Sequence, residues 1–257
     1  MAGLSFNPWQ TRGETVYAIR IGVAGWSVPT KLAAEFPSTG THLERYGTRF
    51  SAVEINSSFY RPHQHKTYVR WAASVPPDFR FSVKLPKVIT HEQRFIGCQD
   101  LVARFAEETS GLGDKRGPVL VQLPPSFAYP GDIAEQFLHA LKVIINGPVV
   151  LEPRHVSWFQ PEVDLMLKRQ HVSRVAADPA RFASAAQPGG WDGLAYFRLH
   201  GFPHIYESLY SAESVQAHAN SIAALSACGT DVWTIYDNTT FGAATQNALE
   251  LIEHCRC

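Results

Sequence analysis

The stretch PVVLEPRHVSWFQPEVDLMLKRQ (148–170) contains one complete strand–loop–helix unit. Its first part, PVVLEPR, is an apolar run of strand length that ends in an acid and a base. Its last part, PEVDLMLKRQ, has apolar residues at three- and four-residue intervals, as an amphipathic helix does. Pro161 suits the first turn of that helix, because the N–H that proline lacks has no helical partner there. Since another strand-like run, SRVAADP (173–179), follows at once, the stretch indicates a parallel β/α/β arrangement.

The same unit recurs along the whole chain. Strand-like runs are IRIGVAG (19–25), SAVEINS (51–57), FRFSVKL (79–85), PVLVQLP (118–124), PVVLEPR (148–154), SRVAADP (173–179), LAYFRLHG (194–201) and DVWTIYDN (231–238). Helical patterns cover residues 42–47, 66–75, 98–112, 132–144, 161–170, 211–228 and 242–255, with Ser211 and Ser214 as a cap for the sixth of these. Only DPARFASAAQPGGWDG (178–193) is too rich in glycine and proline for a full helix. We therefore predict an α/β fold, a single (β/α)8 TIM barrel whose sixth helix is short or irregular.

Two other architectures fit less well. A doubly wound sheet usually carries a glycine-rich phosphate loop after an early strand, and GVAGWS (22–27) does not match that pattern. A half-solvated antiparallel sheet would show the same alternation of side chains, but the intervening helices argue against it. No linker divides the chain, so we predict one domain over residues 1–257, with an N-terminal extension at 1–17 and a frayed tail at 255–257.

The composition narrows the class of protein. The chain has 23 Lys and Arg against 23 Asp and Glu, and this zero net charge makes nucleic acid an unlikely partner, because such binders usually carry a basic excess. The four cysteines lack zinc-site spacing and are expected to be reduced. No apolar run approaches the length of a membrane span, and the first twenty residues do not resemble a signal peptide. We expect a cytoplasmic protein that does not enter membranes.

Side chains alternate between the two faces of each strand, and polar residues gather late in the strands. If the apolar faces pack against helices, the polar faces line the barrel near the carboxyl ends of the strands, where such barrels hold their active sites. On this rule Asp178 opposes Val175 and Ala177, and Tyr236 and Asn238 oppose Trp233 and Ile235. The residues predicted to converge are Glu54, Asn56, Lys84, Gln122, Glu152, Arg154, Asp178, Arg198, His200, Tyr236 and Asn238, with His91 and His155 on nearby loops. The set is either a ligand site or a neutral ion-pair network that fills the upper barrel.

Six stretches of the chain resemble successive motifs of the DUF72, or YecE-like, family. They are EINSSFYRP (54–62), FSVKLPKVITHE (81–92), VQLPPSF (121–127), LEPRHVSWF (151–159), YFRLHG (196–201) and YDNTTFGAATQNALEL (236–251). The resemblance implies a TIM barrel and no particular activity, because none is established for the family. The chain departs from the family pattern in AGWSVPTKLAAEF (24–36), which lacks an expected tyrosine and second tryptophan. It also departs at Asp237-Asn238, where an Asn-Asn pair is more usual.

The candidate residues suggest roles for acid–base chemistry without a metal. We predict Glu152 as the main proton-transfer group and His200 as the second, with Asp178 and Glu54 as further acids. Lys84, Arg154 and Arg198 would hold an anionic or hydroxylated substrate, helped by Asn56, Gln122, His91, His155, Tyr236 and Asn238. A Schiff base on Lys84 is a further option, but a lysine flanked by acids is more often paired with them. No cofactor is predicted; a divalent metal, if one binds, would take Glu54, Glu152, Asp178 and His200 as ligands.

These roles lead to three functional hypotheses. The first is a small-molecule enzyme, a hydrolase or an isomerase, that acts on a polar or anionic substrate at the mouth of the barrel. The second is a metal-dependent phosphodiesterase or nucleic-acid processing enzyme resembling endonuclease IV. The third is a protein that binds a small anionic ligand in the same cavity without converting it.

Overall fold

The computed structural model describes residues 18–256, in which parallel strands form two sheets. The first sheet has the order β1 (Ile19–Val23), β10 (Asp231–Tyr236), β9 (Leu194–Leu199) and β7 (Ala176–Asp178). The second has the order β2 (Ala52–Ile55), β3 (Arg80–Lys84), β4 (Arg116–Gln122), β5 (Val149–Glu152), β6 (Val172–Arg174) and β8 (Gly189–Gly190). Only the short β8 pairs antiparallel among these. The α/β class and the parallel strands are therefore as predicted.

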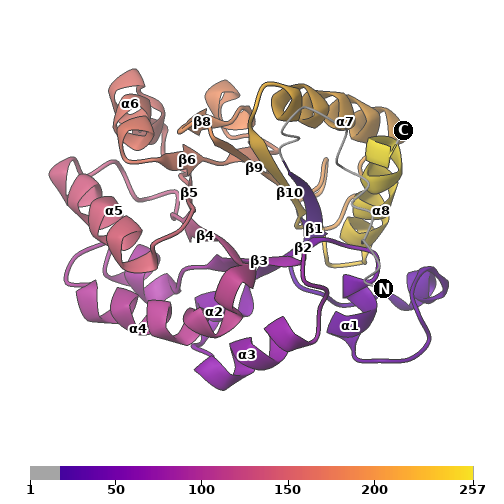
Figure 1. Cartoon of the computed structure of the whole chain (residues 1–257). Coiled ribbons are helices and arrows are strands. Elements are labelled where there is room, and N and C mark those ends of the chain that lie inside the picture. The colour runs from indigo at the N-terminus through magenta and orange to yellow at the C-terminus, as the bar shows by residue number, and fades with distance from the viewer. Residues whose placement is uncertain (1–17, 257) are drawn as a thin grey trace.

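The two sheets face one another around a shared interior (Figure 1). Next to β1, Ala24 forms a parallel bridge with Glu54 of β2, and the N–H of Gly25 donates to the Glu54 carbonyl at 2.9 Å. On the other side, Val175 separates β6 from β7, and its N–H donates to the Leu151 carbonyl at 2.8 Å. Apolar side chains from both sheets meet in one buried cluster: Ala52, Leu120, Val150, Val175, Leu194, Tyr196, Trp233 and Ile235. This cluster forms the floor below the polar residues at the carboxyl ends of the strands.

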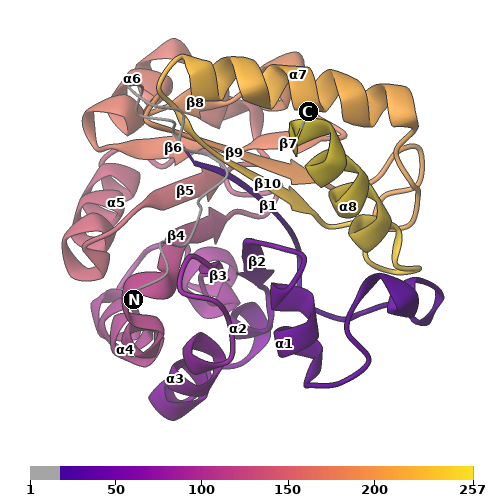
Figure 2. The same cartoon turned by 45° about the vertical axis from the view of Figure 1, so that its right-hand side comes forward.

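Helices lie outside the sheets (Figure 2). They are α1 (His42–Gly47), α2 (Ser57–Tyr60), α3 (His65–Ala73), α4 (Gln99–Thr109), α5 (Asp132–Ile145), α6 (Pro161–Arg169), α7 (Ala212–Ala227) and α8 (Ala243–Arg256). Local sequence sets several ends: Pro161 stands in the first turn of α6, and the Ser211 hydroxyl accepts from the N–H of Ser214 at 3.3 Å before α7. Both features agree with the sequence prediction.

The chain between β7 and β9 has only a 3₁₀ turn at Ala183–Ala186 and the short β8. This segment is the irregular sixth unit that the glycine and proline content predicted. Without a long helix there, a cavity of about 990 Å³ remains between the outer faces of β7 and β9 and helix α7. The cavity left by the absent helix therefore lies on the outer side of the strands and not in the interior that the two sheets share.

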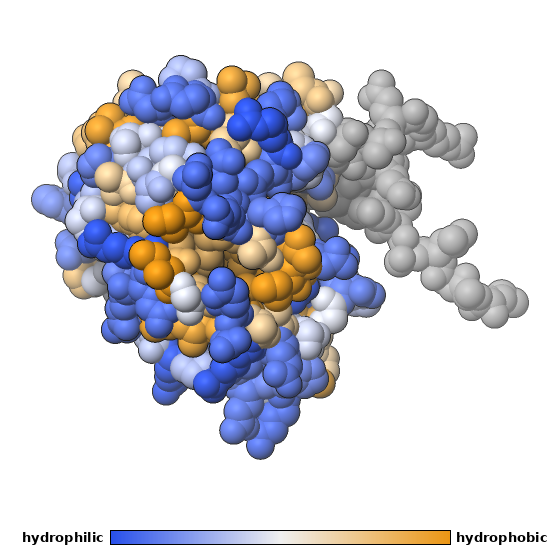
Figure 3. All heavy atoms as spheres, turned by 90° about the vertical axis from the view of Figure 1, so that its left-hand side faces the viewer, coloured by the Kyte–Doolittle hydropathy of each residue, from blue (hydrophilic) through white to orange (hydrophobic). Residues whose placement is uncertain are grey.

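A smaller cavity of about 300 Å³ lies between α4 and α5, and Ile96, Ile133 and Ile144 line it. Figure 3 shows hydrophobic side chains gathered around a hollow on the side of the molecule that carries these helices. The cavity has neither an acid nor a histidine in its lining. It therefore offers mainly apolar contacts, with Cys98 as its one titratable lining residue.

The ends of the chain differ in part from expectation. Cys255, predicted on a frayed tail, is in α8 and packs against the core. The predicted extension at 1–17 and Cys257 lie outside the described residues. None of the described helices is both long and apolar enough to cross a membrane.

Candidate functional site

Arg198 on β9 lies at the centre of the polar residues. It is fully buried, and its guanidinium donates to Glu54 Oε2 (3.1 Å) and Oε1 (2.8 Å), Glu152 Oε2 (2.7 Å) and Asp237 Oδ2 (2.9 Å). Burial alone would lower the pKa of Arg198, but the three carboxylates hold it well above its ordinary value. A buried guanidinium with this many charged partners is a fixed positive charge, because its planar fork matches carboxylate geometry.

Glu152 at the end of β5 has partners on both oxygens. Oε2 accepts from Gln122 Nε2 at 2.9 Å, and Oε1 accepts from Arg154 Nε at 3.2 Å and Nη2 at 3.0 Å. Burial would raise the pKa of Glu152. The charge of Arg198, the contact with His200 and the charge of Arg154 outweigh it and keep the pKa well below its ordinary value. Glu152 is therefore an ionised group held in place by cations.

His200 follows β9 and is only 5 % exposed. Its Nδ1 lies 3.1 Å from Asp237 Oδ2, and its Nε2 lies 3.6 Å from Glu152 Oε1 without a hydrogen bond. Burial lowers the pKa of His200, but the contacts with Asp237 and Glu152 raise it above its ordinary value overall. A small pocket of about 100 Å³ opens beside it and is also lined by Glu152, Arg154 and Tyr206. His200 thus has one ring nitrogen held by an acid and a second, buried nitrogen without a hydrogen-bond partner, next to a small pocket.

Lys84 ends β3 and is 7 % exposed. Its Nζ lies 4.3 Å from the centre of the Phe59 ring, and no hydrogen bond or ion pair to Nζ is found among residues 18–256. Burial and the charge of Arg198 lower the pKa of Lys84 to about 8, although Glu54, Glu152 and Asp237 oppose this. The expectation that Lys84 is paired with its acid neighbours is therefore wrong: both oxygens of Glu54 and of Glu152, and Oδ2 of Asp237, have other partners.

Three further candidates lie around this group. His91 packs edge-on against Phe59 with ring centres 5.0 Å apart; burial, then the charges of Lys84 and Arg154, lower its pKa. Asn56 has a buried Oδ1 without a hydrogen-bond partner. By contrast, Nδ1 of His155 lies 2.9 Å from the hydroxyl of Ser157 in its own loop. His91 and Asn56 remain candidates for ligand contact, while the contact of His155 is local.

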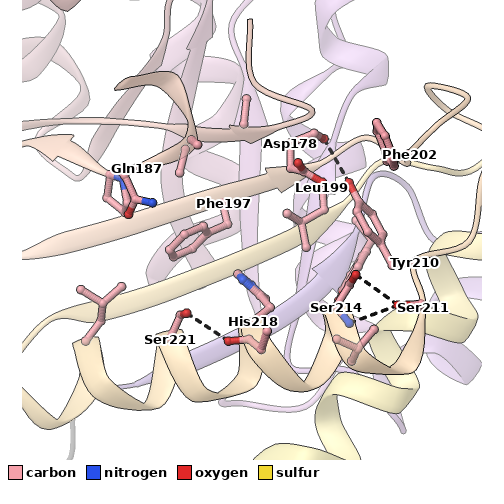
Figure 4. A pocket seen from close by; sticks show the side chains of 18 of the residues that line it. Asp178, Gln187, Phe197, Leu199, Phe202, Tyr210, Ser211, Ser214, His218 and Ser221 are labelled. Atoms are coloured by element: carbon pink, nitrogen blue, oxygen red, sulfur yellow. Dashed lines mark hydrogen bonds between the residues drawn. The ribbon is translucent and has the colours of Figure 1, made fainter. Parts of the chain in front are cut away.

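Asp178 does not join the group, so the predicted orientation of this residue is wrong. Asp178 pairs with Leu199 in the parallel register of β7 and β9, and paired residues point to the same side. Leu199 faces the outer cavity, and Figure 4 shows Asp178 in the same lining beside Tyr210. Val175 instead occupies the inner face at the floor of the interior. Val175 points inward because the lower interior is itself apolar, whereas Ala176 lines the outer cavity with Asp178.

The predicted orientation of Tyr236 and Asn238 is wrong for the same reason. Trp233 and Ile235 of β10 fill the interior floor, so Tyr236 lines the outer cavity. Asn238 Nδ2 donates to the carbonyl of Ser208 at 2.7 Å in a loop contact. The residue missed by the prediction is Asp237, which faces Arg198 and His200. Its departure from the family's Asn-Asn pair was the available signal.

The residues proposed as metal ligands do not fit a metal site. Asp178 faces outward, and the inward oxygens of Glu54 and Glu152 accept from Arg198, Arg154, Gln122 and Tyr196. Among residues 18–256, no group of three or more His, Cys, Asp or Glu side chains is arranged to hold a metal ion. These carboxylates are therefore arranged to pair with arginine side chains and not to bind a metal ion.

Comparisons with known proteins agree with the fold. The family model "Protein of unknown function DUF72" matches residues 20–257. UPF0759 protein YecE of Escherichia coli K12 is 32% identical over 177 residues, which are 66% of this chain and 62% of that protein; the match thus spans under two thirds of the relative. A crystal structure of a DUF72 family protein from Enterococcus faecalis has a TM-score of 0.79 at 21% identity, covering 93% of this chain and 96% of that one. A sugar phosphate isomerase/epimerase from Parabacteroides distasonis has a TM-score of 0.53 at 12% identity, covering 95% and 96%.

Proposed function

The chain belongs to the DUF72 family, and from that premise and the geometry at its strand ends we propose an enzyme that transfers protons on a small anionic substrate. Family membership supplies no reaction, so the proposal rests on the site. The observation that carries it is the contact between Asp237 and His200 Nδ1, which leaves His200 Nε2 beside Glu152 without a hydrogen-bond partner. An acid that orients a histidine, with the second ring nitrogen free, is the usual arrangement of a proton carrier.

We assign the proton-transfer role first to His200, in preference to Glu152. Glu152 is held ionised by Arg198 and Arg154, so it has no proton to give, while the raised pKa of His200 favours the protonated ring. Glu152 then stabilises the protonated ring, and its charge favours return of the proton after each cycle. Both residues remain assigned to catalysis, but His200 is now the main proton-transfer group and Glu152 the second.

An anionic substrate suits the charges around the pocket. Arg198 and Arg154 carry fixed positive charges, Lys84 adds another when its amine is protonated, and the raised pKa of His200 favours a charge on its ring; these oppose the three carboxylates Glu54, Glu152 and Asp237. The side chain of Arg154 remains 25% exposed, so its guanidinium can accept a further anion. We propose that a phosphate or carboxylate of the substrate binds beside Arg154 and Lys84.

Isomerisation fits this site better than hydrolysis. A hydrolase of the two-carboxylate kind needs one acid and one base that are free to act. Here Glu54 and Glu152 both accept from Arg198, which fixes them as partners of a cation. A single histidine that gives and regains a proton is sufficient to move hydrogen between carbon and oxygen atoms of one substrate.

We also propose that the two sheets act as one closed (β/α)8 barrel. Support comes from the Ala24–Glu54 bridge between β1 and β2, and from Val175, which continues β6 into β7. In such a barrel the carboxyl ends of the strands form one mouth, which is where catalytic residues of this fold lie.

Deuterium exchange would test the proposed function. The purified protein is incubated in D2O with phosphorylated aldoses and ketoses, and loss of the proton next to the carbonyl is followed by NMR. We expect exchange with at least one of them, and a decrease of about 10²–10⁴-fold in His200→Asn. Asp178→Asn, whose side chain lies in the outer cavity, is the matched control and should keep the wild-type rate. Equal rates in wild type and His200→Asn would overturn the assignment.

A second candidate, an anion-binding protein without turnover, is favoured by one observation. Glu54, Glu152 and Asp237 each accept a hydrogen bond from an arginine, as in a rigid recognition site. A binding protein of this kind would bind phosphate and catalyse no exchange with any of the sugar phosphates, whereas the enzyme would bind phosphate and also catalyse exchange.

A further inference from the structure

We propose that the amine of Lys84 forms an imine with a carbonyl group of the substrate, which makes the site one for anionic aldehydes or ketones. The inference rests on the proposed function, because it assigns the reactive group of the molecule that binds there. It starts from the placement of Nζ, which is buried at a strand end, directed at the face of Phe59, and without an ion pair among the described residues.

The neighbouring contacts explain why Lys84 remains unpaired. Oε1 and Oε2 of Glu54 accept from Arg198 and Tyr196. Both oxygens of Glu152 and Oδ2 of Asp237 are likewise bound by Arg198, Arg154 or His200. Arg198 therefore forms hydrogen bonds with the carboxylates that would otherwise stabilise a protonated lysine, and its own positive charge disfavours a second cation nearby. The lowered pKa of Lys84, about 8, agrees with this geometry. A neutral amine beside bound cations is the form that attacks a carbonyl carbon.

Imine formation requires the amine, the carbonyl compound, one proton from solvent and a group that carries a proton from nitrogen to oxygen. The lone pair of Nζ adds to the carbonyl carbon, and the carbonyl oxygen becomes a hydroxyl by taking up one proton from solvent. Loss of that oxygen as water then gives the protonated imine. His91 contacts the same Phe59 ring as Lys84, and its lowered pKa leaves the imidazole neutral, so it can take the proton released by nitrogen and deliver it to the departing hydroxyl. Arg154 would hold the anionic group of the same molecule.

Reductive trapping tests this assignment. The full chain is treated with glyceraldehyde 3-phosphate and sodium cyanoborohydride at pH 8, and the adduct is located by peptide mass spectrometry. We expect Lys84 to be modified at least tenfold faster than Lys87, a half-exposed lysine three residues away that is paired with Glu92. Below pH 7 the rate at Lys84 should fall about tenfold per pH unit, because the neutral amine becomes scarce. Lys84→Arg keeps the charge and should lose this adduct, while Lys87→Met keeps it.

Inorganic phosphate separates the two proposals. Slower trapping at Lys84 in its presence supports both the imine and the anion site. If phosphate binds to the wild-type protein but Lys84 reacts no faster than Lys87, the imine is overturned and the anion site stands. If Lys84 reacts fast and phosphate has no effect, the amine stands and the anion site is overturned. Mapping of the wild-type protein decides between these outcomes even if Lys84→Arg fails to fold.

Discussion

Arg198 on β9 and Glu54 on β2 are joined by two hydrogen bonds, Nε to Oε2 at 3.1 Å and Nη2 to Oε1 at 2.8 Å. The two strands belong to different sheets, so this buried pair connects the sheets across their shared interior. Burying two charges is costly, and the pair is tolerated because its geometry is bidentate and Tyr196 satisfies Glu54 further at 2.8 Å.

Removing the charge of Glu54 should therefore destabilise the whole molecule. In Glu54→Gln, Arg198 keeps its charge but loses its strongest partner, and breaking a buried pair in this way costs about 3–5 kcal/mol. Urea unfolding followed by circular dichroism would measure the loss. Asp192→Asn is the matched control, because its pair with Lys168 is exposed, and its midpoint should not move. A similar midpoint in both variants would mean that Glu54 carries no such role.

The pKa of His200 should depend on Asp237. The carboxylate lies 3.1 Å from Nδ1 and is one of the groups that raise this pKa, so Asp237→Asn should lower it. Because the folded pKa is raised, the stability contributed by His200 is present below its ordinary pKa of 6.5 and is lost as pH rises through the folded value. NMR titration of the ring protons in both proteins measures the shift directly. An unchanged pKa in the variant would contradict the assigned contact.

His218 on α7 should make the protein sensitive to acid. Its Nε2 lies 2.9 Å from the Thr234 hydroxyl, and burial lowers its pKa from 6.5 to about 4. The folded ring stays neutral while the unfolded chain takes up a proton, so stability falls as pH drops from 6.5 toward 4. The loss from this residue is at most about 3 kcal/mol. Unfolding at pH 7 and pH 4.5 should show a smaller difference in His218→Gln than in the wild type; equal differences would rule this out.

The sequence was sufficient for most of the fold and for part of the site. Strand and helix periods, Pro161 and the Ser211 cap predicted the elements, and alternation correctly placed Glu54, Lys84, Gln122, Glu152, Arg198 and His200 at the strand ends. The rule that polar faces line the interior failed on β7 and β10, where Val175, Trp233 and Ile235 fill an apolar floor. The inner face of one strand can carry apolar residues in the floor and polar residues at the carboxyl end, so alternation alone does not tell which face points inward. The unpaired state of Lys84 also required the structure, because it depends on which oxygens Arg198 reaches.

Asp178 was predicted to lie in the site and does not, whereas Asp237 was not predicted and does; comparing variants of these two acids is therefore the most direct test of where the site is. Asp178 ends β7 and lies in the lining of the outer cavity beside α7 (Figure 4). Asp237 directly follows β10 and contacts Arg198 and His200. Asp237→Asn removes the charge that orients His200, so proton exchange on a substrate should fall by about 10²-fold or more. Asp178→Asn should leave the rate unchanged, because its side chain touches none of the residues assigned to the site. The two variants are made with the same isosteric change and are compared by the D2O assay at the same pH. A larger loss in Asp178→Asn than in Asp237→Asn would move the reacting centre to the outer cavity.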